Sequence, residues 1–259
     1  MSLQGDELTT LVDKVMSTVD RTIAENDSMY GGNDEHYFGV GRDALRATLD
    51  ALHGAGRPAP ARVLDFGSGY GRVMRTFRAA FPDAELIACD LDPAAVARCV
   101  EAYGATPMAA SVDVDLIEQV HDVDLIWCGS VLTHLDAPQW TPVLRYFSRA
   151  LKPGGIAVVT THGRRVAWRM ENVAERTYGL TEPVLNRVLA AYYAAGFGYG
   201  DYPGQDGYGI SLSKPGWAAD KVLEAPDLRL VGYREAAWDQ HQDVLVLAKD
   251  ANAMLKVHR

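Results

Sequence analysis

The feature that most constrains the fold is an alternation, between residues 61 and 162, of short apolar runs with stretches of helical periodicity. The runs are ARVLDF (61–66), AELIACD (84–90), TPMAA (106–110), DLIWCG (124–129) and GIAVVTTH (155–162). Helical patterns fill the gaps at 70–81, 93–103 and 138–151. Runs that are apolar on both faces and separated by helices are typical of parallel strands covered on both sides. The sequence therefore predicts an α/β protein with a doubly wound, mostly parallel sheet.

The flanking segments are expected to complete this sheet. Two helical patterns, within residues 6–25 and about 43–52, come before the linker GAGRPAPA. RLVGYREA (229–236) and QDVLVLAKD (242–250) predict a closing antiparallel strand pair. Before them, SKPGWAADKVLEA predicts a helix with Ser213 as its N-cap and Pro215 in its first turn.

A longer segment, residues 164–212, interrupts the alternation. It holds a helix at 181–197 and a stretch rich in glycine and tyrosine, and we interpret it as a lid. The predicted organisation is an N-terminal helical cap (1–60), a ligand-binding α/β core (61–163), a lid-like insertion (164–212), and a C-terminal helix with the antiparallel strand pair (213–259).

The stretch VLDFGSGYGR (63–72) follows the first predicted strand. In open α/β sheets ligands bind beyond the carboxyl ends of the strands, and Gly67 and Gly69 permit the positive φ that lets backbone approach a ligand closely. A nucleotide P-loop requires Lys and Ser/Thr after its last glycine, whereas Arg72 and Val73 follow here. The GxGxxG fingerprint requires glycine at position 72, so the spacing also disfavours a nicotinamide dehydrogenase.

Two acids beside this loop describe its ligand. Asp65 would repel a pyrophosphate and suits a positively charged group instead. Asp90 ends the second predicted strand, about twenty residues past the glycines, where an acid can accept hydrogen bonds from ribose hydroxyls. The implied ligand has a ribose, no phosphate and a cationic group, a description that fits S-adenosylmethionine.

Four segments follow one another in this order: VLDFGSGYGR, CDLDP, DLIWCGSVLTHL and LKPGGIAVVTTHG. Together they resemble the class I S-adenosylmethionine-dependent methyltransferases over about residues 60–163. The terminal QDVLVLAK is similar to the closing strand of that family. The resemblance implies a seven-stranded Rossmann-like sheet whose last strand is antiparallel, with S-adenosyl-L-methionine as the cofactor.

The resemblance also implies roles for individual residues in binding that cofactor. The backbone of Gly67, Ser68 and Gly69 would hold the methionine portion, with Asp65 near its aminoacyl group. Asp90 would bind the ribose and Leu91 the adenine ring. Many members place an acid after the third strand, against the adenine amino group; this chain has AASVDVD there, so Ser111 and Val112, or Asp113, would substitute. The cleft beside the methyl group would be lined by Cys128, Gly129 and Ser130.

Two histidines are candidates for catalysis. Methyl transfer from a sulfonium depends mainly on proximity and alignment, and a general base is needed only when the attacking atom must lose a proton. His162 and His134 both follow predicted strands and titrate near neutrality, so either could act as this base. For His134 the alternative is a role in supporting its loop.

Aromatic residues on either side of the core suggest how the site is covered. In EHYFGVGR (35–42), Tyr37 could cover the methyl site and Arg42 could pair with the cofactor carboxylate, although a solvated helix start is the alternative. Tyr192 and Tyr193 fall at helical positions and suit a core. The stretch 199–208 is interpreted as a pocket wall for a small organic acceptor.

Composition narrows the class further. The net charge of −9 and the single short basic cluster disfavour a nucleic-acid partner. There is no apolar run of about 18 residues, no secretory signal and no CxxC among three cysteines, which favours a cytoplasmic protein without a membrane partner. No metal-ligand spacing is present.

We therefore predict methyl transfer to an O or N atom of a small-molecule acceptor of sugar or natural-product type, by a monomer or homodimer. The alternatives are a protein or nucleic-acid methyltransferase and a non-catalytic S-adenosylmethionine-binding protein.

Overall fold

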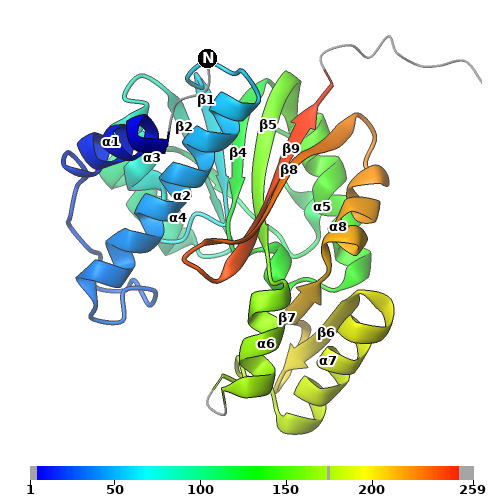
Figure 1. Cartoon of the computed structure of the whole chain (residues 1–259). Coiled ribbons are helices and arrows are strands. Elements are labelled where there is room, and N and C mark those ends of the chain that lie inside the picture. The colour runs from blue at the N-terminus through cyan, green and yellow to red at the C-terminus, as the bar shows by residue number, and fades with distance from the viewer. Residues whose placement is uncertain (1–4, 174–175, 251–259) are drawn as a thin grey trace, which may run out of the picture.

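The computed structural model describes residues 5–173 and 176–250, and a seven-stranded sheet forms the centre of the fold (Figure 1). In chain order its strands are β1 (Arg62–Phe66), β2 (Glu85–Asp90), β3 (Thr106–Ala109), β4 (Val123–Cys128), β5 (Leu151–Thr161), β8 (Leu228–Trp238) and β9 (Gln242–Lys249). They lie side by side in the order β3-β2-β1-β4-β5-β9-β8. Strands β1 to β5 pair in parallel, whereas β9 runs antiparallel to both β5 and β8. The predicted α/β sheet and its closing antiparallel pair are confirmed.

Helices cover both faces of this sheet. On one face lie α2 (Asp34–Gly54), α3 (Met74–Ala80) and α4 (Pro93–Tyr103), with α1 (Gly5–Met16) packed on the outside. On the other lie α5 (Ala137–Ala150) and α8 (Pro215–Leu223). Each face has its own apolar core, and Phe77 and Trp140 are fully buried on opposite sides. Strands buried on both faces explain why the apolar runs are continuous rather than alternating.

Capping residues set the boundaries of α4 and α5, which lie within one residue of the predicted ranges. Asp92 accepts a hydrogen bond from the Ala94 amide at 2.9 Å, and Gly104 ends α4 in the left-handed region at φ 61°. At α5, Asp136 and Gln139 form a capping box. These caps place the loops after β2 and β4 at one edge of the sheet.

Other helix boundaries differ from the prediction. Helix α2 begins at Asp34, because Asn33 caps the His36 amide at 3.0 Å, so the segment 35–42 is helical rather than a loop. Helix α1 ends at Met16, short of residue 25. Helix α8 has Lys214 at its N-cap; the predicted cap, Ser213, is the last residue of a strand.

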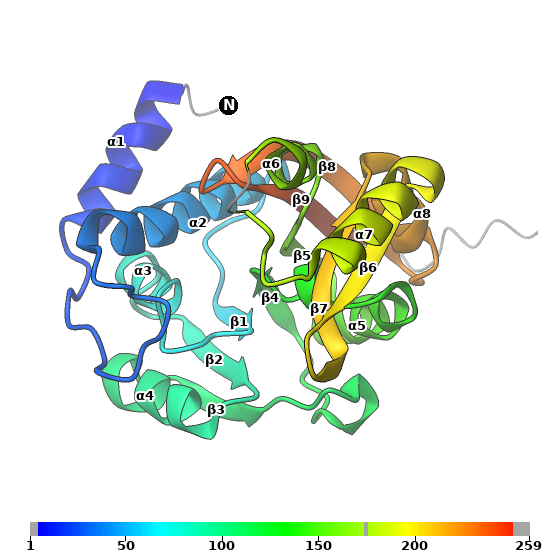
Figure 2. The same cartoon turned by 90° about the horizontal axis from the view of Figure 1, so that it is seen from below.

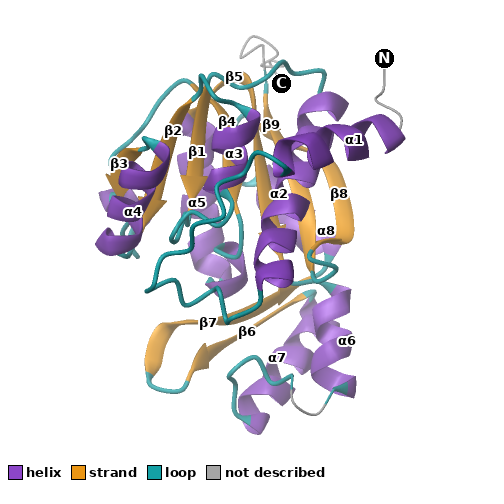
Figure 3. Ribbon diagram, turned by 90° about the vertical axis from the view of Figure 1, so that its left-hand side faces the viewer, coloured by secondary structure: helices purple, strands orange, loops and turns teal. Residues whose placement is uncertain are grey.

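Residues 164–213, called the insertion below, contain α6 (Arg164–Asn172), α7 (Glu182–Ala195) and a separate hairpin of β6 (Phe197–Tyr202) and β7 (Gln205–Ser213). We did not predict this hairpin. Gly198 and Gly209 are needed in it because a Cβ at either position would lie about 2 Å from a carbonyl oxygen, 2.0 Å and 1.9 Å respectively. The insertion lies beyond the carboxyl ends of the parallel strands (Figures 1 and 3), and Figure 2 views that edge from below.

Two short 3₁₀ turns, η1 (Val114–Leu116) and η2 (Leu132–His134), complete the described elements. Among the helices of the described chain, none is long and apolar enough to cross a membrane.

Candidate active site

The glycine loop after β1 is fastened to the end of β2. The amides of Gly67 and Ser68 both donate to the Cys89 carbonyl, at 2.8 and 3.1 Å. Gly67 has φ +88°, and a Cβ there would lie 2.5 Å from Cγ2 of Val131. Gly69 has φ +50°, and no described atom lies within 4 Å of where its Cβ would be. The two glycines therefore differ: Gly67 is required by packing, whereas Gly69 faces open space that a ligand can occupy.

Asp90 organises this loop. One carboxylate oxygen accepts the Gly69 amide at 2.7 Å and the other accepts the Asp92 amide at 3.0 Å. A carboxylate has about four lone-pair positions, so both oxygens retain room for a further donor. The geometry suits the predicted contact with two ribose hydroxyls, which stays a prediction.

Asp65 is the most unusual group of the loop. Its side chain is 2% exposed, and its Oδ2 atom has no hydrogen-bond partner among the described residues. Burial, reinforced by the nearby negative charge of Asp90, raises the pKa of Asp65 to about 8. A buried carboxyl group with an unused oxygen lacks a donor, and a cationic amine would supply one.

The residues predicted to contact adenine lie on an open edge. Leu91 is 57% and Val112 is 83% exposed, and Ser111 is half-buried with its hydroxyl accepting the Asp113 amide at 3.2 Å. Asp113 caps the 3₁₀ turn η1 through the Asp115 amide. Exposed apolar side chains next to Asp90 are compatible with an adenine wall, and their role stays a prediction.

The end of β4 departs from the predicted cleft lining at one residue. The Cys128 side chain is fully buried in the apolar core, and burial raises the pKa of its thiol, so only its backbone can face the cleft. Gly129 is packed against the indole of Trp127, where a Cβ would lie 2.7 Å from Nε1.

Ser130 is held in the left-handed region by a ring of hydrogen bonds. Its φ is +59°, a conformation that L side chains rarely adopt. Its amide donates to Oγ1 of Thr160 at 2.9 Å, Thr160 donates to Gln242 at 2.6 Å, and Gln242 donates back to Oγ of Ser130 at 2.6 Å. The ring joins β4, β5 and β9, and it fixes the turn that carries Val131 over Gly67.

His134 connects the core to the insertion. Its Nδ1 atom lies 2.8 Å from the Gly209 carbonyl, and its ring stacks on Tyr208 with centroids 4.9 Å apart. Burial lowers its pKa. Because a carbonyl can only accept, Nδ1 carries the proton and donates to the hairpin. This contact favours the supporting role over catalysis for His134.

His162 lies at the end of β5, under the insertion. It is 4% exposed, its Nδ1 atom has no partner among the described residues, and its ring faces Tyr178 and His241 with centroids 5.8 and 5.4 Å away. Burial, with His241 and His134 nearby, holds the pKa of His162 well below its usual range. The imidazole is therefore neutral at physiological pH and keeps a free lone pair.

Tyr37 and Arg42 do not occupy the places that the sequence suggested. Tyr37 is completely buried in α2, where its hydroxyl donates to Asp27 and accepts from Arg75 at 3.2 Å. Arg42 forms an ion pair with Asp13 on α1. Because α2 extends back to Asp34, both residues lie on a helix rather than in the expected break, and both contact other residues of the N-terminal region.

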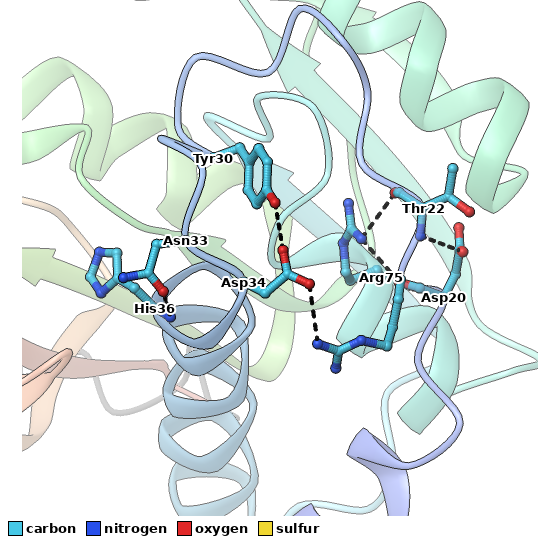
Figure 4. Close-up of polar contacts among 8 residues, drawn as sticks. Asp20, Thr22, Tyr30, Asn33, Asp34, His36 and Arg75 are labelled. Carbon is cyan, nitrogen blue, oxygen red and sulfur yellow. Dashed lines mark hydrogen bonds and ion pairs between the residues drawn. The ribbon is translucent and has the colours of Figure 1, made fainter.

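Arg75 provides the link between the N-terminal segment and the glycine loop. Its guanidinium donates to the carbonyls of Asp20 and Thr22 at 2.9 and 3.2 Å, and its Nε contacts the Gly71 carbonyl at 3.3 Å. Figure 4 shows this arginine reaching the chain at Asp20 and Thr22, with Tyr30 bonded to Asp34 nearby at 2.6 Å. The segment before α2 is thereby fixed beside the loop.

Sequence reasoning missed several residues of this region: Asp27, Arg75, Arg169 as a site residue, Tyr178, His241 and Gln242. None lies in a recognisable motif. Their neighbours along the chain differ in character, so no shared local signal would have selected them.

Residues 64–157 match the family model described as a methyltransferase domain. A malonyl-[acyl-carrier protein] O-methyltransferase of Laribacter hongkongensis is 29% identical over 132 residues, covering 47% of this chain and 42% of the relative. A trans-aconitate 2-methyltransferase of Methylobacterium nodulans is 30% identical over 125 residues, covering 48% and 46%. The chain thus spans less than half the length of these two relatives.

A solved structure extends the likeness in fold to almost the whole chain. The Burkholderia thailandensis 1,6-didemethyltoxoflavin-N1-methyltransferase, with bound 1,6-didemethyltoxoflavin and S-adenosylhomocysteine, aligns with a TM-score of 0.57 at 16% identity, over 96% of this chain and 92% of that one. Residues 64–157 therefore match a methyltransferase domain, and the described chain has the fold of the class I S-adenosylmethionine-dependent methyltransferases. The resemblance inferred from the four sequence segments is confirmed.

Proposed function

We propose that this protein transfers the methyl group of S-adenosyl-L-methionine to an O or N atom of a small-molecule acceptor. The observation that carries the proposal is the buried Asp65 carboxyl group with its unused oxygen, next to a loop with open space at Gly69. The cationic amino group of the cofactor fits the first feature, and its methionine portion fits the second. Asp90 is in position to accept from the ribose.

When bound, the cofactor supplies a methyl group already activated by a sulfonium, so the protein has little covalent chemistry to perform. The residues of this chain would bind, orient and exclude water. Asp65 would anchor one end of the cofactor and Asp90 the other. The ring of Ser130, Thr160 and Gln242 would keep the turn after β4 rigid beside the reacting atoms.

His162 is the candidate base. Its lone pair lies in a buried position at the end of β5, where it can accept a proton from an attacking O–H or N–H group. Because burial keeps the pKa of His162 low, the imidazole is neutral and its lone pair is available to take the proton that an acceptor O–H or N–H would lose. His134 would act by holding the hairpin in place.

The insertion supports an acceptor of small size. Helix α6 and the β6–β7 hairpin lie beyond the carboxyl edge of the sheet (Figure 3). The hairpin contacts His134 through the Gly209 carbonyl, and the ring of Tyr178 contacts the ring of His162. A covered site suits a compact molecule better than a polymer. The two relatives are named for malonyl-[acyl-carrier protein] and trans-aconitate, both carboxylic acids, which adds organic acids to the sugars and natural products considered from the sequence.

The test begins with calorimetric titration of the protein with S-adenosylmethionine, with NADH as the comparison ligand. Micromolar binding of S-adenosylmethionine alone is expected. Release of S-adenosylhomocysteine in the presence of an acceptor panel would then establish transfer. Tight binding without turnover of any acceptor class would favour a non-catalytic cofactor-binding protein, and equal binding of NADH would contradict the cofactor assignment.

A further inference from the structure

Four polar side chains meet where the insertion faces the end of β5. Most of their free hydrogen-bonding groups are donors. They are Arg169 on α6, Tyr178 in the loop after it, His241 between β8 and β9, and His162 at the end of β5. Tyr178 and His241 stack with centroids 5.6 Å apart. The four come from segments up to 79 positions apart and belong to no motif.

The contact between Arg169 and His241 fixes the direction of the hydrogen bonds. Nη1 of Arg169 lies 2.9 Å from Nδ1 of His241. A guanidinium can only donate, so Nδ1 accepts and the remaining imidazole proton is on Nε2, which is a donor. Burial, together with the charges of Arg169, Arg176 and Arg165, lowers the pKa of His241 to about 4, which keeps the ring in this neutral form.

Among the described residues, no carboxylate pairs with the guanidinium of this cluster. Within residues 5–173 and 176–250, Arg169 forms no ion pair with a carboxylate, although Arg164 on the same helix pairs with Glu235 at 2.9 Å. The Tyr178 hydroxyl is buried without a well-formed hydrogen bond, and Arg169 lies close enough to oppose the rise that burial causes in the pKa of Tyr178. In a chain of net charge −9, a guanidinium with no carboxylate partner among the described residues, beside the buried Tyr178 hydroxyl, needs an explanation.

We propose that this cluster binds the carboxylate of the methyl acceptor, so that the acceptor is a small organic acid. The inference rests on the proposed function and names its substrate class. The planar guanidinium matches a carboxylate in a bidentate manner, and Nε2 of His241 and the Tyr178 hydroxyl add donors around it. His162, whose ring centroid is 5.4 Å from that of His241, lies within the reach of a single small molecule.

The test is a titration of the protein, saturated with S-adenosylhomocysteine, with trans-aconitate as the carboxylate probe, followed by NMR of the histidine rings. We expect the signals of His162 and His241 to shift with saturation, and Arg169→Met to weaken binding at least tenfold. Arg164→Met is the matched control, because Arg164 is exposed on the same helix and its guanidinium pairs with Glu235. This control should bind the probe normally.

Three outcomes would overturn the inference: no shift of either ring, unchanged binding in Arg169→Met, or equal binding of the neutral triamide of the probe. Stronger binding of inorganic phosphate than of trans-aconitate would overturn the carboxylate assignment. If Arg169→Met fails to fold, His241→Phe serves instead, because it removes the Nε2 donor and keeps a ring. This variant must weaken binding of the probe. Failure of S-adenosylhomocysteine to bind refutes the proposed function instead, and the probe titration is then read on the protein alone.

Discussion

The cofactor side and the acceptor side of the proposed site are constructed differently. The first is formed by two short stretches, 65–69 and 90–92, joined by backbone hydrogen bonds to Asp90 and Cys89. The second gathers His162, Arg169, Tyr178 and His241 from separate elements, mainly through ring contacts. Backbone geometry constrains the cofactor side, so few sequences can form it. Side-chain packing alone forms the acceptor side, which leaves it free to vary with the substrate.

The largest expected effect concerns Asp90→Ala. This change removes the acceptor of two loop amides and of the ribose hydroxyls, and each hydrogen bond to a charged group contributes about 1.5–3 kcal/mol, so affinity for S-adenosylmethionine should fall by about 10²–10⁴. Calorimetry measures it. Glu85→Ala, at the exposed start of the same strand, is the control and should bind normally. Unchanged affinity in Asp90→Ala would remove the ribose assignment.

The acceptor side is probed by His162→Asn. If His162 accepts the proton of the acceptor, kcat should fall by about 10², the low end for general-base catalysis, while the Kd for S-adenosylmethionine stays within about twofold. Single-turnover kinetics separate the chemical step from binding. His134→Asn should instead lower stability through the lost bond to Gly209, with a smaller effect on the rate. Equal rates for parent and His162→Asn would leave that histidine a packing role.

Two glycine variants separate packing from ligand contact within the cofactor side. Gly67→Ala should destabilise the fold by about 2–3 kcal/mol, because its Cβ would meet Val131 at a positive φ. Gly69→Ala should cost about 1 kcal/mol of stability, for the positive φ alone, yet weaken cofactor binding at least tenfold. Urea unfolding and calorimetry give the two quantities. If both variants lost stability and neither lost affinity for the cofactor, the space at Gly69 would hold no ligand.

The smallest expected effect is a gain in stability. The folded-state pKa of Asp65, about 8, lies above its ordinary value of 3.8, so folding is penalised increasingly as the pH rises between these values. Asp65→Asn removes this penalty, and without cofactor it should be more stable than the parent by at least about 1 kcal/mol at pH 8, with a smaller difference at pH 5. Urea unfolding at both pH values measures this. The variant should also lose cofactor affinity, and a pH-independent difference would contradict the assignment.

Much of the fold and of the cofactor side could be predicted because their signals are local. Apolar runs buried on both faces required a parallel sheet, and the cap at Asp92 with Pro93 and Gly104 set α4 to the residue. The glycine spacing at Gly67 and the acid Asp65 disfavoured a phosphate-bearing ligand, and Asp90 indicated a ribose. Each of these signals lies within a short stretch of the chain. The same reasoning did not predict that Tyr37 and Arg42 lie on a helix, because one capping residue, Asn33, starts α2 earlier than its apolar pattern does.

The sequence by itself thus determined the parallel strands, the closing antiparallel pair and the edge at which a ligand would bind, since periodicity and glycine spacing act over a few residues. Only the tertiary structure decided that Cys128 faces the core, that residues 197–213 form a hairpin, and that Arg169 meets His241. These outcomes depend on contacts between segments distant in the chain, and such contacts are stabilised by packing that no local pattern encodes.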